Sequence, residues 1–374
     1  AQAILAQAPD GASSAPRHAP PADAVAMAAT TAVAPDDGTS ALFFPQRDHE
    51  PVPARDMFAV PCRDGSTLLC CRLLRARRGT VARRTLVYFH GNGELVSKLY
   101  APSGIPGIPN FRDLLDYLLA SEHCGLASAV LVEYRGHGPN AALGPTLASL
   151  LSDAEDVVRA LGVAEEQLVV MGRSTGTIPA VHLAGLHPKL FALVVESGMG
   201  DALAWVAQKL GTPTADFERT PVGHMLRQRQ ATLRDFPGVF LVLHCADEEV
   251  FPLEEHGRRN FLLACGSEHV AEPDAPVVDL SVDPMAPCVL RACDTSQGMR
   301  AVKALCEFEN GGHNFIWPMN WKAYSACLKR LLVGTLLADA SGSPVPGSWW
   351  TDVAKSRFGS DGRRLESRRG CVIT

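Results

Sequence analysis

Short apolar runs alternate with amphipathic segments along the middle of this chain. Six runs rich in Val and Leu end in polar residues, and they span residues 85–90, 128–134, 167–172, 190–197, 238–244 and 304–310. Nearly continuous apolar character of this kind is typical of strands that are buried on both faces of a parallel sheet. The pattern therefore predicts six central strands.

Apolar residues at helical spacing occupy the gaps between the first runs. Two sets show this spacing: Phe111, Leu114, Leu115, Leu118 and Leu119, then Leu151, Ala154, Val157, Val158 and Leu161. The alternation of strand and helix predicts an α/β fold with a mostly parallel, doubly wound sheet. Upstream, segments 57–62 and 68–74 flank the turn residues 63–66, which predicts an antiparallel hairpin at the sheet edge.

Composition along the chain predicts one central domain, at residues 41–340, between two tails. Residues 1–40 are rich in Ala and Pro, and residues 341–374 in Ser, Gly and Arg, so we expect both tails to be disordered. Within the domain, segment 198–236 interrupts the alternation and is expected to form a small cap. Segment 268–300 is acidic, contains Pro and lacks a period, which predicts an inserted loop.

Charge and cysteine usage narrow the class of protein. The net charge of -5 gives no reason to expect nucleic-acid binding, and no apolar run reaches the ~18 residues of a membrane-spanning helix. No signal peptide is visible, so we expect a cytoplasmic protein. The 11 cysteines form neither a CxxC pair nor a cluster with zinc spacing. We therefore expect free, mostly buried thiols, and neither a metal nor another cofactor.

The first candidate for chemistry is the sequence Gly172-Arg173-Ser174-Thr175-Gly176, which fits G-x-S-x-G. A nucleophile presented this way needs a strand-to-helix turn too sharp for side chains at the flanking positions, and glycines meet that demand. A predicted strand precedes the motif and a plausible helix, 177–184, follows it. The positive end of that helix would face the candidate nucleophile, Ser174.

A Gly-rich turn follows the first strand, in the sequence His90-Gly91-Asn92-Gly93-Glu94. Acyl transfer needs fixed donors for the oxyanion of a tetrahedral intermediate. The backbone N–H of Asn92 or Gly93 would supply one donor, and that of Thr175 the other. The alternative is a plain turn at the end of a strand.

Position selects the candidate base among 12 histidines. His313 lies on a loop after the last strand, from which it can reach back to the nucleophile. His137 also follows a strand and is the main competitor. His182 falls inside a predicted helix and His244 at a strand end, where structural roles are expected.

An acid that orients the histidine is expected between the nucleophile and the base in chain order. Asp247, Glu248 and Glu249 follow the predicted strand 238–244. Three consecutive carboxylates at a strand end also fit an ordinary solvated loop. Both interpretations stay open on these residues alone.

Taken together, six motifs resemble the α/β-hydrolase superfamily, in the branch of serine-aminopeptidase-like, monoacylglycerol-lipase-like and depalmitoylase-like hydrolases. They stand in that family's order across residues 42–335, at residues 42–45, 64–65, 90–93, 134–138, 172–176 and 312–314. The resemblance implies the α/β-hydrolase fold, with an antiparallel N-terminal hairpin and a small cap.

The same resemblance implies a serine hydrolase that acts through an acyl-enzyme on Ser174, with His313 as general base and no cofactor. A carboxylic ester or thioester is the expected substrate: a lipid, a small ester or an S-acylated protein. A serine peptidase of the same fold and a non-catalytic scaffold are the alternatives.

The acid loop departs from the family pattern, His-Gly-x-x-Asp-x-x-x-Pro. Counting from His244, or back from Pro252, places the acid at Glu248, with Asp247 one residue early. We favour Glu248, and Asp247 remains the alternative.

The last four residues, Cys371-Val372-Ile373-Thr374, have the C-a-a-X form of a prenylation signal, with arginines upstream. A lipid on Cys371 together with the basic patch would give peripheral membrane association through the tail. An unmodified, disordered tail is the alternative.

Overall fold

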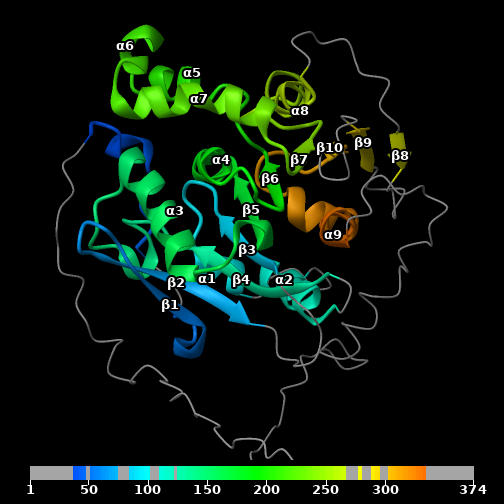
Figure 1. Ribbon diagram of the computed structural model, residues 1–374, viewed down its shortest axis with the longest axis horizontal. Coiled ribbons are helices and arrows are strands. Elements are labelled where there is room, and N and C mark those ends of the chain that lie inside the picture. Colours follow the sequence, from blue (N-terminus) through cyan, green and yellow to red (C-terminus); the bar gives the residue numbers. More distant parts are fainter. Residues whose placement is uncertain are drawn as a thin grey trace, which may run out of the picture.

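The computed structural model describes residues 37–47, 51–74, 84–101, 109–121, 124–266, 277–279, 288–294 and 302–333. At its centre lies a ten-stranded sheet (Figure 1). Its order is β1-β2-β4-β3-β5-β6-β7-β10-β9-β8. The strands are β1 Met57–Pro61, β2 Thr67–Leu74, β3 Arg84–Phe89, β4 Leu126–Val132, β5 Leu168–Arg173, β6 Ala192–Glu196, β7 Val239–Cys245, β8 Val277–Asp279, β9 Cys288–Asp294 and β10 Val302–Phe308.

The middle of the sheet is parallel and its two ends are antiparallel. Strands β4, β3, β5, β6, β7 and β10 pair in parallel, in that order. The hairpin β1–β2 joins β4 antiparallel at one end, and β9 and β8 continue antiparallel from β10 at the other. This is the α/β-hydrolase fold, so the fold class and the N-terminal hairpin predicted from the sequence are confirmed.

The longer helices cover both faces of the sheet. The helices are α1 Val96–Tyr100, α2 Phe111–Ala120, α3 Leu147–Leu161, α4 Thr177–Leu186, α5 Ala202–Lys209, α6 Thr214–Glu218, α7 Pro221–Asp235, α8 Arg259–Ala264 and α9 Ile316–Val333. Helices α2 and α9 pack on one face and α3 and α4 on the other, so each face has its own apolar core. Strand β5, which leads to Ser174, is buried along its whole length.

Local sequence explains where two of these helices begin. Asn110 caps α2 by accepting from the N–H of Asp113, and Thr146 caps α3 by accepting from the N–H of Ser149. Helix α3 ends at Leu161 and is capped by Gly162, whose φ of 59° is the left-handed conformation that favours glycine. These caps fix the helices that flank the central strands.

The segment expected to form a cap folds into α5, α6 and α7, between β6 and β7, and α7 packs against α4 (Figure 1). It approaches the candidate site through aromatic rings. Trp205 of α5 lies 5.8 Å from Phe251, measured between ring centroids, and Phe251 lies 5.4 Å from His313. Segment 198–236 is therefore connected to the predicted base through two successive contacts between aromatic rings.

The structure adds detail to two of the segments expected from the sequence. Segment 268–300 is not only a loop, because β8 and β9 lie within it and extend the sheet from β10. Within the expected N-terminal tail, Asp37 and Thr39 accept from the N–H groups of Ala148 and Leu147 at the start of α3. A helix leaves its first N–H groups without partners, and these side chains supply them. Residues 1–36 and 341–374 of the two tails, Cys371 included, lie outside the described residues.

Candidate active site

Ser174 lies on a sharp turn between β5 and α4. Its φ of 52° is in the left-handed region, which a non-glycine residue adopts only when its surroundings impose it. A Cβ on Gly172 would lie 2.2 Å from the carbonyl oxygen of Gly176, and one on Gly176 would lie 2.2 Å from that of Phe89. Both glycines are therefore required by close packing, as the motif predicted.

Ser174, His313 and Glu248 form a continuous hydrogen-bonded series. Ser174 Oγ is 3.0 Å from His313 Nε2, and His313 Nδ1 is 2.8 Å from Glu248 Oε1. When His313 carries its proton on Nδ1, the ring donates to Glu248 and Nε2 accepts from the serine hydroxyl. The structure thus brings together, from three different loops, the nucleophile, base and favoured acid expected from the sequence.

Glu248 is held in its ionised form. Burial favours the protonated carboxyl, but the hydrogen bond and the charge of His313 outweigh burial and lower the pKa of Glu248 to about 2. The N–H groups of Val250 and Phe251 also donate to Glu248 Oε1. A fixed anion at this point stabilises a positive charge on the His313 ring.

The two neighbouring carboxylates contact the backbone of the histidine loop instead of the ring. Asp247 accepts from the N–H groups of Gly311 and Gly312, at 3.1 and 2.8 Å. Glu249 accepts from the N–H of His313, at 3.0 Å. Four hydrogen bonds therefore join these three acids to the histidine loop, and of the three acids Glu248 alone reaches the imidazole.

The predicted oxyanion turn lies next to the nucleophile. A Cβ on Gly91 would be 3.4 Å from Ser174 Cβ. The Asn92 side chain holds the segment 42–44, because it donates to the carbonyl of Leu42 and accepts from the N–H of Phe44. Gly93 forms the turn, with a φ of 80°, and Thr175 lies in the short helix η6, Ser174–Gly176. The three predicted donors thus lie on the two segments that meet at Ser174.

The competing histidines have other partners. His137 Nδ1 bonds to the carbonyl of Arg135, His182 Nε2 to Glu155, and His244 Nε2 to the carbonyl of Phe251. His90 is buried in the first motif, where its ring bonds to Glu133 and to the Gly91 carbonyl. None of these four is hydrogen-bonded to Ser174.

A buried cation that was not predicted from the sequence lies beside the nucleophile. Arg173, the second residue of the G-x-S-x-G motif, is paired with Glu94 and Glu196. A signal was present, because a strand that is otherwise wholly apolar ends in an arginine, and β6 beside it ends in a glutamate. Opposite charges at the ends of neighbouring buried strands predict an ion pair.

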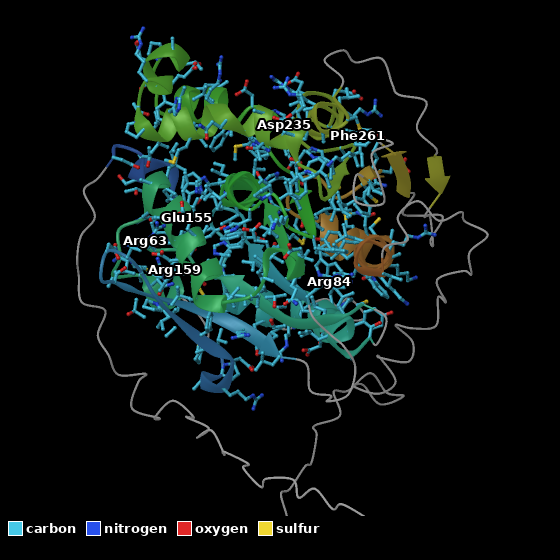
Figure 2. The ribbon with its side chains drawn as sticks, in the orientation of Figure 1. Arg63, Arg84, Glu155, Arg159, Asp235 and Phe261 are labelled. Carbon is cyan, nitrogen blue, oxygen red and sulfur yellow. The ribbon has the colours of Figure 1, made fainter. Side chains whose placement is uncertain are left out.

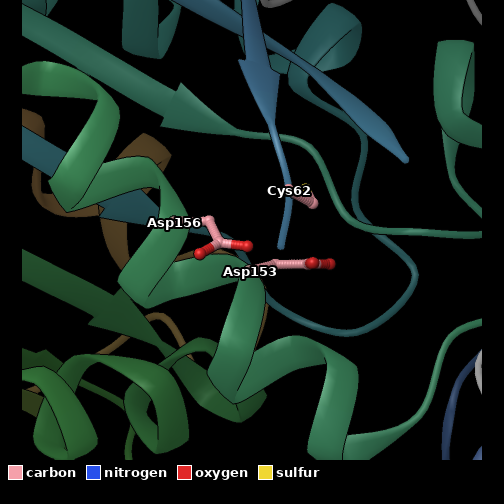
Figure 3. A group of neighbouring side chains, drawn as sticks. All are labelled: Cys62, Asp153 and Asp156. Atoms are coloured by element: carbon pink, nitrogen blue, oxygen red, sulfur yellow. The ribbon is translucent and has the colours of Figure 1, made fainter. Parts of the chain in front are cut away.

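A second cluster, of Cys62, Asp153 and Asp156, brings three metal-ligating atoms within 4.8 Å of one another (Figure 3). Its carboxylates are already neutralised by arginines. Arg135 contacts both oxygens of Asp153, at 2.7 Å each. Arg63 donates to both oxygens of Asp156 through its backbone N–H and its Nε, at 2.8 Å each. Both oxygens of each carboxylate thus accept from arginine residues, and the cluster is part of an ion-pair network.

That network ties the β1–β2 turn to α3. Arg63, on the turn, also pairs with Glu155, and Arg159 pairs with Asp156. Figure 2 shows Arg63, Glu155 and Arg159 gathered at this end of the molecule.

No helix among the described residues is both long and apolar enough to cross a membrane.

Comparison with known proteins gave no matching family model and no matching curated protein. Solved structures do resemble the chain. An esterase domain of a Rhodothermus marinus protein is 15% identical, with a TM-score of 0.39, over 57% of this chain and 84% of that one. A puromycin-hydrolyzing peptidase of Mycobacterium tuberculosis is 14% identical, with a TM-score of 0.45, over 80% of this chain but only 40% of that one. A Pyrococcus furiosus esterase is 14% identical, with a TM-score of 0.39, over 59% of this chain and 84% of that one.

Proposed function

We propose that this protein is a serine hydrolase that cleaves a carboxylic ester or thioester through an acyl-enzyme on Ser174. The observation that carries the proposal is the series Ser174–His313–Glu248, with distances of 3.0 and 2.8 Å. Nucleophile, base and orienting acid in hydrogen-bond contact are the arrangement that acyl transfer requires. Ionised Glu248 gives the series a fixed negative end.

In the proposed reaction, Ser174 Oγ attacks the substrate carbonyl while His313 Nε2 takes the hydroxyl proton. Glu248 stabilises the imidazolium without accepting its proton. The negative charge on the carbonyl oxygen is stabilised by the N–H of Thr175 and an N–H of the 91–94 turn. His313 then protonates the leaving alcohol or thiol. A water molecule then attacks the acyl carbonyl as His313 takes its proton, the bond from the acyl carbon to Ser174 Oγ breaks, and His313 returns the proton to Ser174 Oγ as the acid leaves.

Exposed apolar side chains on the catalytic loops support an acyl substrate. Phe44 donates its backbone N–H to the Asn92 side chain, Val250 lies two residues beyond Glu248, and Phe315 lies two beyond His313. These three, with Met319 one helical turn after Phe315, are among the most exposed large apolar side chains described, at 46–63%. We propose that these four side chains form an apolar rim around Ser174, which would suit the acyl chain of an ester or thioester better than a charged or strongly polar group.

A panel of model substrates tests this proposal. The purified protein is assayed with p-nitrophenyl esters of increasing chain length, an acyl-thioester and an aminoacyl anilide, alongside Ser174→Ala and, as a matched control, Ser152→Ala on α3. We expect turnover of esters and thioesters that Ser174→Ala abolishes and Ser152→Ala retains. Turnover of the anilide alone would favour the peptidase, and no turnover of any substrate would favour a scaffold.

A further inference from the structure

The side chain of Arg173 contacts both loops that must meet at Ser174. It is 6% exposed and belongs to the residue directly before the nucleophile. Its Nη2 donates to the carbonyl of His313, at 2.5 Å. Its Nη1 lies 2.7 Å from Glu94 Oε1, at the end of the 91–94 turn. One guanidinium thus connects the histidine loop, the nucleophile strand and the oxyanion turn.

Glu94 transmits this contact to the oxyanion turn. Its second oxygen, Oε2, accepts from the N–H of Gly91, at 2.5 Å, and the Glu94 N–H donates to the Gly91 carbonyl. A Cβ on Gly91 would lie 2.8 Å from Arg173 Nη1 and 2.9 Å from Glu94 Oε2. The Arg173–Glu94 pair therefore occupies the space against Gly91 and fixes where the turn lies relative to Ser174.

The third partner anchors the guanidinium from behind. Arg173 Nε lies 3.3 Å from Glu196 Oε1, at the end of β6. The other oxygen of Glu196 accepts from the hydroxyl of Tyr324 on α9, at 2.5 Å. The planar guanidinium is bonded to three partners inside the protein and has little freedom to change its contacts. A flexible lysine ammonium would have that freedom.

We infer that Arg173 is a positioning residue that holds the His313 loop and the oxyanion turn in register with Ser174. The inference rests on the proposed function and deepens it. Arg173 touches no reacting atom: it acts through the His313 carbonyl on one side and through Glu94 and Gly91 on the other. Loss of its geometry should affect the transition state more than substrate binding, since a misplacement of about 1 Å can cost about a hundredfold in rate.

The test is Arg173→Lys, which keeps the charge but cannot reach all three partners at once. Its matched control is Arg135→Lys. Arg135 is equally buried and also pairs with two carboxylates, Asp64 and Asp153, but it contacts neither the histidine loop nor the 91–94 turn. For each folded variant, kcat is measured per titrated active site with a p-nitrophenyl ester. We expect kcat of Arg173→Lys to fall by about tenfold to a hundredfold with KM changed less than about threefold, and Arg135→Lys to keep both.

A second variant keeps the inference testable if Arg173→Lys does not fold. Glu94→Gln is isosteric but has one acceptor oxygen in place of two, so it cannot accept from both Arg173 and the Gly91 N–H, and kcat should fall by about tenfold at unchanged KM. In the double variant the losses should not add, because both residues act through one chain of contacts. If Arg173→Lys or Glu94→Gln turns over like Arg135→Lys, the inference is wrong and the proposed function stands. If the wild-type protein does not turn over, the proposed function fails, and the inference fails with it.

Discussion

The imidazole of His313 lies 2.8 Å from the carboxylate of Glu248 and is not bonded to the adjacent Asp247. This is notable because Asp, and not Glu, is the usual acid in the family pattern that the sequence resembles. The longer side chain reaches the ring, while the shorter one accepts from the N–H groups of Gly311 and Gly312. Two adjacent acids therefore have separable tasks. One orients the imidazole and the other holds the loop that carries it.

The first prediction separates these two acids. Glu248→Gln removes the anion that selects the productive tautomer of His313. We expect kcat to fall by about 10³–10⁴, which is the scale of the loss when the acid of the serine-protease triad is replaced by its amide. Asp247→Asn keeps one acceptor for the glycine N–H groups and should cost less than about tenfold. Steady-state kinetics on a p-nitrophenyl ester measures both. A larger loss for Asp247→Asn would assign the acid to Asp247.

The second prediction concerns Glu196 and pH. Burial raises the pKa of Glu196 from 4.5 to about 7, and the negative charge of Glu94 adds to this rise. The charge of Arg173, the hydrogen bond from Tyr324 and the charge of His313 lower the same pKa but do not outweigh burial. Because the folded state binds this proton more tightly than the unfolded chain, the stabilisation is complete below pH 4.5 and is lost as the pH rises to 7. Between pH 5 and 8 the contribution of Glu196 should fall by roughly 2–3 kcal/mol.

Urea unfolding of the wild type and of Glu196→Gln, at pH 5 and at pH 8, measures that contribution. The variant cannot titrate at this position, so its free energy of unfolding should decline less between the two pH values. Other groups titrate equally in both proteins and cancel in the difference. Equal declines would show that Glu196 is already ionised at pH 5 in the folded protein.

The third prediction addresses the apolar rim. Phe315→Ser removes a 59% exposed ring two residues from His313 and should leave the fold intact. We expect kcat/KM to fall about three- to tenfold for long-chain p-nitrophenyl esters and to change little for the acetate, because only a long chain reaches the rim. The matched control is Leu186→Ser, at an exposed position at the end of α4. An equal loss for acetate and for long chains would show that Phe315 supports the His313 loop and not the acyl chain.

The sequence predicted the sheet well because its central strands are buried on both faces. The runs at 167–172 and 238–244 coincide with β5 and β7 within one residue at each end. Motif order also predicted that Ser174, Glu248 and His313 would meet, since the carboxyl ends of parallel strands lie at one edge of the sheet. Strands β8 and β9 were missed, because β8 has only 3 residues and Arg291 interrupts the apolar run of β9.

Contacts between loops were the part that could not be predicted. Nothing in the spacing indicates that Asp247 and Glu249 bond to the backbone of the histidine loop, since such contacts depend on how two loops approach in space. Arg173 was missed for a related reason. The second position of G-x-S-x-G is variable in the motif, and its partners Glu94 and Glu196 lie 79 positions before it and 23 after it in the chain. Only the folded sheet brings these three charges together.

Covalent labelling of Ser174 tests the central claim most directly. A fluorophosphonate reacts only with a serine activated by its base, so the reaction reports on the series Ser174–His313–Glu248 without knowledge of the substrate. We predict that intact mass rises by one phosphonyl group, that peptide mapping places the group on Ser174, and that labelling is lost in Ser174→Ala and strongly slowed in His313→Gln. A folded wild-type protein that gains no mass, or that gains it at another residue while Ser174 stays unmodified, would contradict the account.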